Sequence, residues 1–176
     1  MSRLELNLER LRLWDLALCV RLNAAIRIVP VRRVFRLVSR LGDGMFWYAL
    51  MLVLLAANGA GALIPVAHMA ATGLVCTLLY KWLKSKTSRP RPFAVESAVH
   101  AGADPLDAFS FPSGHTLHAV AFSAVAIAYY PILVVLLAPF TLLVALSRVV
   151  LGLHYPSDVL AGAALGALVA CASFRL

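Results

Sequence analysis

Two histidines and an aspartate lie at the ends of long apolar segments, where ionisable side chains are costly and are usually functional. His115 closes the run Phe111-Pro112-Ser113-Gly114-His115, and His154 lies six residues after Arg148. Asp158 follows His154 by four residues, so its carboxylate can reach the imidazole ring if a helix begins there. A carboxylate on one ring nitrogen fixes the tautomer and leaves the lone pair of the other nitrogen free to attack. We therefore expect His154 to be a nucleophile that Asp158 orients.

The residues from Pro112 to His115 are predicted to start a helix, because a polar loop ends and an apolar run begins there. The first N–H groups of a helix have no internal partner and carry partial positive charge, which suits an anion. Gly114 lets a ligand approach the backbone closely, and the Ser113 hydroxyl adds a donor. The alternative is an ordinary helix start, in which Ser113 is the N-cap and His115 is solvated.

Three basic residues are predicted to meet at this helix start: Lys84, Arg91 and Arg148. Two apolar spans separate the loop before Pro112 from residues 148–158, so both lie at the same membrane face. Forked arginine donors, a lysine charge and backbone N–H groups together suit a dianionic phosphate. His154 would then attack the phosphorus, and His115 would protonate the leaving oxygen.

Simpler interpretations stay open for these charges. Lysines at the end of a span are often solvated anchors, and Arg148 with Asp158 would also make a structural ion pair. His68, at the opposite face, and His100, inside the loop, receive no role. His118, one turn beyond His115, can at most support the site.

Taken together, these residues resemble the three-part signature of the type 2 phosphatidic acid phosphatase superfamily. The three motifs correspond in order to Lys84 with Arg91-Pro92, to Pro112-Ser113-Gly114-His115, and to Ser147-Arg148 with His154 and Asp158. They cover residues 84–158, and the flanking apolar spans fit the helical bundle of that family.

The resemblance implies a metal-independent integral-membrane phosphatase, without a cofactor, that hydrolyses a lipid phosphate or diphosphate through a phosphohistidine. The residues that would hold the phosphate are Lys84, Arg91, Ser113, Gly114 and Arg148. His154 would attack, Asp158 would support it, and His115 would be the acid. Similar membrane proteins act on polyprenyl diphosphates such as undecaprenyl diphosphate, on phosphatidylglycerophosphate, on phosphatidate or on lipid A. The short loops of this chain favour a simple lipid phosphate.

Two other functions remain open. A catalytically idle phospholipid-binding or transport-related bundle would keep the anion pocket, but it would not require a nucleophile with an orienting carboxylate. A lipid phosphotransferase would pass the phosphoryl group to an acceptor other than water, and the sequence offers no site for one.

The composition is that of an integral membrane protein. Of 176 residues, 62% are hydrophobic, and the mean hydropathy is +0.87, whereas soluble domains are roughly 45–50% apolar. The segments that can span about 30 Å of hydrocarbon are Met45–Leu63, Pro65–Leu83, Thr116–Tyr130, Ile132–Val150 and Asp158–Phe174. The third is short and extends back through Gly114. We expect one all-α domain over residues 1–176, a polytopic membrane helix bundle with about five transmembrane helices.

The first 44 residues are expected to form basic helices in the plane of the membrane interface. Their arginines alternate with apolar residues at Arg3, Arg10, Arg12, Arg21, Arg27, Arg32, Arg33, Arg36 and Arg40. Charges bracket the apolar stretch Leu16–Val20 too closely for a comfortable span, although a transmembrane alternative stays open. The glycines of Leu41-Gly42-Asp43-Gly44 should break the helix, and the aromatic residues 46–48 should form an interfacial belt.

Turns are expected at the opposite face, near Ile64-Pro65 and Tyr129-Tyr130-Pro131, and neither turn carries Lys or Arg. The polar loop between the second and third spans is long enough to be functional. Gly162 and Gly166 in the last span have the spacing of close helix packing.

The net charge of +8 fits anionic lipid headgroups or a phosphate substrate better than nucleic acid, and no protein partner is indicated. Cys19, Cys76 and Cys171 are expected to be small core residues, not disulfides or metal ligands. The N-terminus does not resemble a cleaved signal peptide. We expect a multi-pass protein of a bacterial inner membrane. The positive-inside rule places the site in the cytoplasm, whereas the family resemblance favours the outside, and both stay open.

Overall fold

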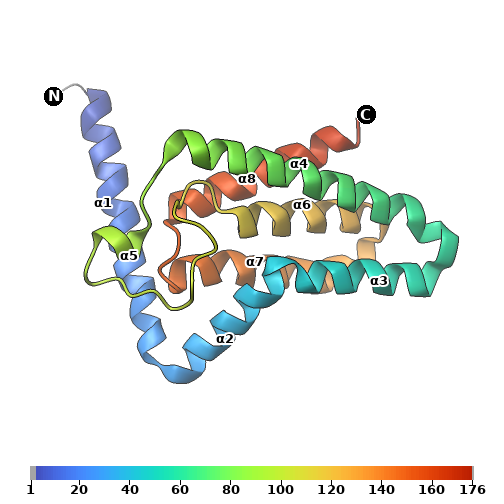
Figure 1. Cartoon of the computed structure of the whole chain (residues 1–176), viewed down its shortest axis with the longest axis horizontal. Coiled ribbons are helices and arrows are strands. Elements are labelled where there is room, and N and C mark those ends of the chain that lie inside the picture. Colours follow the sequence, from blue (N-terminus) through green and yellow to red (C-terminus); the bar gives the residue numbers. More distant parts are fainter. Residues whose placement is uncertain (1–2, 176) are drawn as a thin grey trace.

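The computed structural model describes residues 3–175, and every regular element in this part of the chain is a helix or helical turn (Figure 1). The α-helices are α1 (Arg3–Asn23), α2 (Val29–Arg40), α3 (Phe46–Asn58), α4 (Leu63–Thr87), α5 (Pro92–Val95), α6 (Gly114–Tyr129), α7 (Val134–Val150) and α8 (Pro156–Ser173). Short helical turns join some of them: η1 (Ala24–Arg27), η2 (Leu41–Met45), η3 (Gly59–Ala62) and η4 (Pro131–Leu133). The predicted all-α fold is confirmed. Of the N-terminal arginines named above, Arg3 has a side chain that lies outside the described part of the structure.

Five helices, α3, α4, α6, α7 and α8, run along the long axis of the molecule, and α6 contacts α4, α7 and α8 (Figure 1). Within residues 3–175, the helical stretches long and apolar enough to cross a membrane are Val29–Val95, Pro131–Val150 and Pro156–Ser173. The first of them contains both α3 and α4. Helix α6 begins at Gly114, as predicted, and its 16 residues rise about 24 Å. The five helices therefore correspond in position to the five expected spans, and α3, with 13 residues, is shorter still than α6.

Helices α6 and α8 approach each other closely at two glycines of α8. A Cβ atom added to Gly162 would lie 2.6 Å from the backbone oxygen of Ser113, and one added to Gly166 would clash with that of Leu117. Any larger residue would push the helices apart, because real Cβ atoms essentially never come within 3.0 Å of such neighbours. The predicted packing role of these glycines is confirmed, and it fixes the start of α6 against α8.

The turn between α3 and α4 lies earlier than predicted. It is formed by η3, and Pro65 belongs to the first turn of α4. Gly59 has a φ of +54°, a left-handed conformation that glycine adopts without a steric penalty, so the chain reverses there. Proline is tolerated in the first helical turn because the N–H that it lacks would have no helical partner. The other turn, which follows Tyr129, lies where it was predicted.

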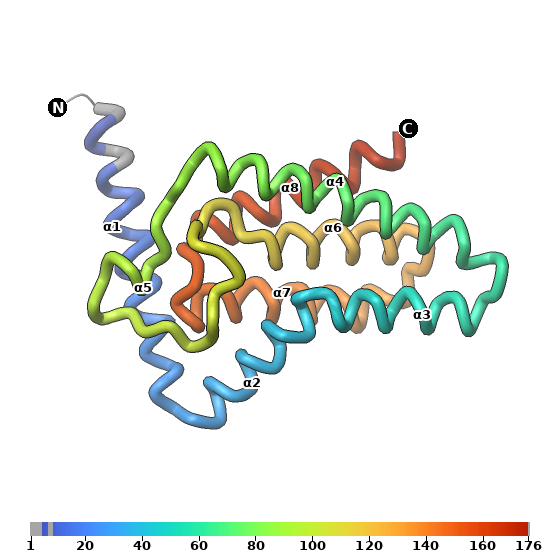
Figure 2. Tube along the Cα trace, in the orientation of Figure 1, coloured from blue at the N-terminus to red at the C-terminus, as the bar shows by residue number. Residues whose placement is uncertain are grey.

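The N-terminal helix α1 lies across one end of the bundle, and α2 leads obliquely back to α3 (Figures 1 and 2). Asn23, the last residue of α1, donates from Nδ2 to the backbone oxygens of His100 (2.9 Å) and Val150 (3.0 Å). Its Oδ1 accepts from the backbone N–H of His100 (2.8 Å). Exposed apolar side chains of α1 include Leu11, Leu13 and Trp14. The helix is thus bonded to the bundle while it keeps apolar surface outside, and its interfacial location stays a prediction.

Two expectations about single residues are wrong. Trp47 is not part of an interfacial belt, because its side chain is buried among three phenylalanine rings of the bundle. Cys171 is not a core residue, because it lies exposed on α8, whereas Cys19 and Cys76 are buried as predicted. Apolar side chains are stable on the outside of a bundle when lipid is the solvent, so apolar neighbours in the sequence do not identify a core position.

Candidate active site

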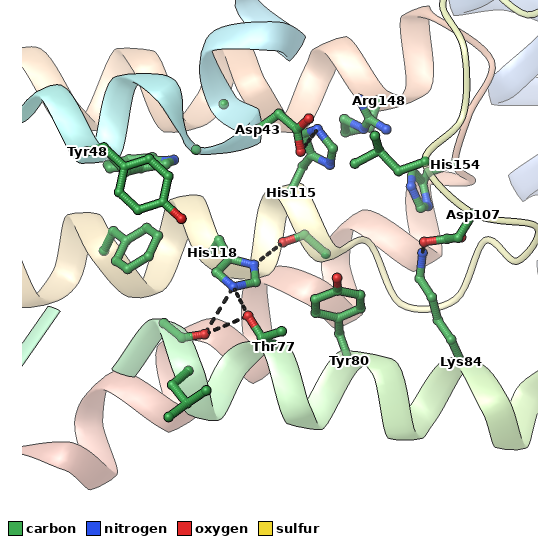
Figure 3. Close-up of a pocket in the computed structure, with 18 of the residues that line it drawn as sticks. Asp43, Tyr48, Thr77, Tyr80, Lys84, Asp107, His115, His118, Arg148 and His154 are labelled. Carbon is green, nitrogen blue, oxygen red and sulfur yellow. Dashed lines mark hydrogen bonds and ion pairs between the residues drawn. The ribbon is translucent and has the colours of Figure 1, made fainter. Parts of the chain in front are cut away.

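A cavity of about 490 Å³ opens between η2, α3, α4, α6 and the end of α7 (Figure 3). At one end its lining is polar and charged, with Asp43, Tyr80, Lys84, Arg91, Asp107, His115, Arg148 and His154. Mostly apolar side chains line the remainder, among them Trp47, Met51, Ala70, Leu74 and Phe122, together with Tyr48, Thr77 and His118. The cavity thus has the shape of an amphiphile, with one charged end and one apolar arm.

Six of the eight site residues predicted from the sequence line this cavity: Lys84, Arg91, Gly114, His115, Arg148 and His154. The other two lie behind it. Asp158 is buried beneath His154, and Ser113 is buried at the first turn of α6. Residues from three separate elements of the bundle and from the loop before α6 therefore converge, as the count of spans indicated.

The pair His154 and Asp158 is formed where α8 begins. Asp158 is the third residue of α8, and its Oδ2 accepts a hydrogen bond from the backbone N–H of Tyr155 (2.9 Å) in a capping box. The same oxygen lies 3.6 Å from Nδ1 of His154. Catalytic hydrogen bonds are often long in an empty site and tighten around a ligand. This arrangement directs Nε2 of His154 away from Asp158, as a nucleophilic nitrogen requires.

His154 lies in the turn between α7 and α8, and its side chain is almost completely buried. Burial, followed by the positive charges of Arg148, Arg91 and Lys84, holds the pKa of His154 well below its ordinary value. The imidazole is therefore neutral at neutral pH and keeps a lone pair. Its Nε2 lies 3.4 Å from Nη1 of Arg91, so the lone pair faces the cluster of cations.

Arg148 has a donor that is free for a ligand. The guanidinium is buried and donates from Nη1 to the hydroxyl of Ser39 on α2. Its Nε is buried and has no hydrogen-bond partner among the described residues. A buried guanidinium N–H without a partner is costly, and an anion in the cavity would remove that cost. Arg148 does not pair with Asp158, so the simpler interpretation of these two residues is not what the structure shows.

Asp107, from the loop before α6, forms ion pairs with the other two cations, Lys84 and Arg91. Its carboxylate accepts from Nζ of Lys84 at 2.6 Å and from Nη2 of Arg91 at 2.8 Å. Burial raises the pKa of Asp107, but the hydrogen bonds and charges of Lys84 and Arg91 outweigh burial, so its pKa is lower than usual. Lys84 and Arg91 are therefore held together by an internal anion, which an incoming phosphate has to replace.

The hydroxyl of Ser113 does not point into the cavity. It contacts Oγ1 of Thr116 at 3.0 Å and accepts from the Thr116 backbone N–H, so it caps α6. The backbone N–H of Ser113 donates to the backbone oxygen of Asp158 at 3.1 Å. The structure thus shows the capping role that the sequence left open, while Gly114 supplies the backbone that lines the cavity.

Sequence analysis missed a second network behind His154. Arg89 donates to Oδ1 of Asp158 (2.6 Å) and to Oδ2 of Asp15 on α1 (2.8 Å), and it lies over the ring of Tyr155. Asp15 also accepts from the backbone N–H and the hydroxyl of Ser157. One signal was available, since an aspartate beside an apolar helical stretch requires a partner. That this partner is Arg89 could not be predicted from the sequence.

The remaining histidines lie outside the charged end of the cavity. His68 contacts Tyr129 and Ser173, and His100 lies in the loop after α5. His118 borders the cavity, but its ring nitrogens contact the backbone oxygen of Gly114 and the hydroxyl of Thr77 (Figure 3). It therefore supports the first turn of α6, consistent with the supporting position predicted for it.

Comparison with known proteins identifies relatives of this arrangement. The family model described as the PAP2 superfamily matches residues 47–176. Decaprenylphosphoryl-5-phosphoribose phosphatase of Mycobacterium tuberculosis is 38% identical over 113 residues, which are 63% of this chain and 54% of that protein. Lipid A 1-phosphatase of Rhizobium johnstonii is 28% identical over 187 aligned residues, covering 88% of this chain and 77% of that protein. The match thus spans only about half the length of the mycobacterial relative.

Solved structures resemble the whole bundle. The PAP2-type phosphatidylglycerolphosphate phosphatase of Bacillus subtilis has a TM-score of 0.74 and 25% identity, covering 94% of this chain and 85% of that one. LpxE of Aquifex aeolicus has a TM-score of 0.76 and 26% identity, covering 92% and 94% of the two chains. Because both cover more than nine tenths of this chain, they include at least part of α1 and α2, which precede the family match at residue 47.

Proposed function

The chain belongs to the PAP2 superfamily, and on this premise we propose that it is an integral-membrane phosphatase that hydrolyses a lipid phosphate or diphosphate through a phosphohistidine. The observation that carries the proposal is the meeting of three cations and a neutral, carboxylate-backed histidine at the charged end of a cavity with an apolar arm. Binding alone requires the cations, but it does not require a buried nucleophile with an orienting carboxylate.

In the first step Nε2 of His154 attacks the phosphorus, and a nitrogen–phosphorus bond forms as the bond to the leaving oxygen breaks. His115 donates a proton to that oxygen, which keeps the bonding electron pair. Asp158 stabilises the positive charge that develops on His154. Lys84, Arg91 and Arg148 offset the charge on the three remaining oxygens.

In the second step a water molecule attacks the phosphohistidine. His115, now neutral, accepts a proton from this water, and the nitrogen–phosphorus bond breaks to release phosphate and the free His154 ring. The same residue thus acts as acid and then as base. No charge has to be supplied from outside the chain in either step, because the residues that offset it already line the cavity.

The substrate class follows from the two ends of the cavity. A phosphate or diphosphate headgroup suits the charged end, and a lipid chain suits the arm lined by Trp47, Met51 and Leu74. Polyprenyl diphosphates, phosphatidylglycerophosphate and phosphatidate all have this form. The relatives named above include a phosphatase for a prenyl-linked phosphoribose and one for lipid A. A simple lipid phosphate is the substrate that we expect first, because the 490 Å³ cavity leaves little room for a large headgroup.

Phosphate release by the detergent-solubilised protein tests the proposal. Wild type and His154→Ala are assayed in EDTA with undecaprenyl diphosphate, phosphatidylglycerophosphate, phosphatidate and lipid A. We expect wild type to release phosphate from at least one lipid and His154→Ala from none. A wild-type protein that is silent on all four lipids, or a variant that stays active, would contradict the proposal.

A further inference from the structure

We propose that Asp43 is a positioning residue for the general acid: its carboxylate holds Nε2 of His115, so that Nδ1 serves the leaving oxygen. The inference rests on the proposed function, and it assigns a role to a carboxylate outside the three motifs. Oδ1 of Asp43 lies 3.5 Å from Nε2 of His115, and both side chains line the charged end of the cavity (Figure 3).

The position of Asp43 is determined by the break between α2 and α3. Asp43 and Gly44 leave helical geometry inside η2, and Gly44 has a φ of +122°, which favours glycine. Gly42 packs against Val144 of α7 so closely that a Cβ atom would lie 2.9 Å from its Cγ2. A residue with a side chain at either glycine would displace this turn. The two glycines therefore set the aspartate at the cavity wall, facing α6.

The charges around His115 show why a carboxylate is needed there. The groups that act electrostatically on this ring are Arg148 from α7, Lys84 from α4, His118 from α6 and His154 from the turn after α7. All four are cations or can become cations. A general acid has to be protonated before the leaving oxygen takes the proton. Positive neighbours disfavour the protonated imidazole, because that form is itself positively charged. Asp43 is the acidic side chain in ion-pair contact with the ring.

The groups that face Asp43 leave its carboxylate free to act on the ring. They are Arg148 from α7, His118 from α6 and Tyr80 from α4. Arg148 donates from Nη1 to Ser39, so that donor does not compete for the Asp43 oxygens. Lys84 and Arg91 pair with Asp107. Asp43 therefore balances the positive charge on the His115 side of the cavity, as Asp107 does on the other side.

The assignment of the two ring nitrogens follows from this contact. With Nε2 facing Asp43, the proton on Nδ1 passes to the leaving oxygen when the phosphorus–oxygen bond breaks. In the second step Nδ1 accepts a proton from the attacking water. Asp43 itself neither gains nor loses a proton. Its part is to hold the ring in one orientation and to favour the protonated form.

The test compares two leaving groups in one preparation. A general acid matters for a lipid alcohol, which leaves poorly, and much less for p-nitrophenol, which leaves easily. We expect Asp43→Asn to lower kcat for a lipid monophosphate by about 30-fold, which is less than the roughly 10²–10⁴-fold that a general acid itself contributes. For p-nitrophenyl phosphate we expect a loss of less than about threefold, because this leaving group needs little protonation. KM should not rise, because a negative charge near the phosphate is removed. The ratio of the two rates does not depend on the fraction of folded protein.

Asp104→Asn is the matched control, since Asp104 is an exposed aspartate of the loop and does not line the cavity. Its ratio of rates should equal that of wild type. Asp43→Glu should recover part of the loss with the lipid substrate. In a His115→Gln background, Asp43→Asn should add less than about threefold, because coupled residues are not additive.

The pH profile of kcat is an independent readout. Loss of the carboxylate should move the alkaline limb, where the acid loses its proton, to lower pH by about one unit, and Asp43→Glu should move it back. Equal losses for both leaving groups, an unmoved alkaline limb, or an undiminished effect in the His115→Gln background would overturn the inference. A wild type that releases no phosphate would contradict the proposed function instead, so the two failures are distinguishable.

Discussion

The two histidines at the charged end of the cavity each face a carboxylate at nearly the same distance, yet their surroundings differ. His154 lies 3.6 Å from Asp158, and His115 lies 3.5 Å from Asp43. The side chains of the first pair are 2% and 0% exposed, whereas those of the second are 10% and 44% exposed. The first pair belongs to one turn of chain, and the second joins two elements that are far apart in the sequence.

The difference matches what each histidine has to do in the proposed reaction. A nucleophile needs a lone pair, and a dry position among cations keeps the His154 ring neutral. An acid needs a proton that is replenished in every cycle, and the His115 side chain, which is more exposed than that of His154, is more accessible to the water that supplies it. The same pair of residue types is thus specialised by burial and by neighbouring charge, not by the distance between ring and carboxylate.

Removal of each histidine should have the largest effects. His154→Ala should abolish turnover of every phosphate ester. His115→Ala should lower kcat for a lipid monophosphate about 10³-fold, but that for p-nitrophenyl phosphate less than about tenfold. Steady-state kinetics with both esters provide the measurement. If the two alanine variants lost both activities equally, the division into nucleophile and acid would be wrong.

Removing the buried carboxylate should be the next largest effect. Asp158→Asn should lower kcat about 10²-fold, because the ring of His154 loses its orientation and the support for its developing charge. Unlike the loss in Asp43→Asn, this loss should be equal for lipid and p-nitrophenyl esters, since both esters need the same attack by His154. A leaving-group dependence in Asp158→Asn would contradict the assignment of this pair to attack. Asp104→Asn again serves as the control.

The acid limb of the pH profile reports the protonation of His154. Attack requires a neutral His154, so activity falls as pH decreases through the pKa of this residue. Because that pKa is held well below 6.5, the acid limb of kcat/KM should lie well below pH 6.5. Arg91→Gln removes one of the charges that hold it there, and we expect the limb to move upward. An acid limb at or above pH 6.5 in wild type would mean that the free enzyme attacks with a different group.

The smallest expected change concerns Asp107, whose carboxylate pairs with Lys84 and Arg91. Asp107→Asn should let inorganic phosphate bind without displacing a carboxylate from Lys84 and Arg91. We expect the inhibition constant of phosphate to fall by about tenfold, a free-energy change of about 1.4 kcal/mol. Competitive inhibition of lipid hydrolysis measures this constant. Weaker phosphate inhibition in the variant would mean that Asp107 mainly holds the two cations in place.

The fold and the main site were predictable from local rules. Apolar length predicts the spans, and parity of spans places Lys84, Arg91 and Arg148 on one side. A spacing of four residues predicts that Asp158 reaches His154. These inferences need only the period of a helix and the thickness of a bilayer.

The unpredicted part depends on tertiary packing. Asp43 reaches His115 because α2 and α3 bend at a glycine pair, and Asp15 reaches Arg89 because α1 crosses the end of the bundle. Asp107 lies in a loop, and a loop has no regular sequence periodicity from which its course could be predicted. No spacing rule connects such residues, since they meet only when whole elements have packed.

The contact of α6 with α8 has a mechanical consequence. Ser113, at the start of α6, is bonded through its backbone N–H to Asp158 at the start of α8, and Gly162 presses against its carbonyl oxygen. The first turn of α6, which lines the charged end of the cavity, is therefore joined directly to the carboxylate behind His154. Bilayers of different thickness tilt helices by different amounts. A shared tilt of α6 and α8 carries both groups together, so we expect their relative position to depend little on the thickness of the membrane.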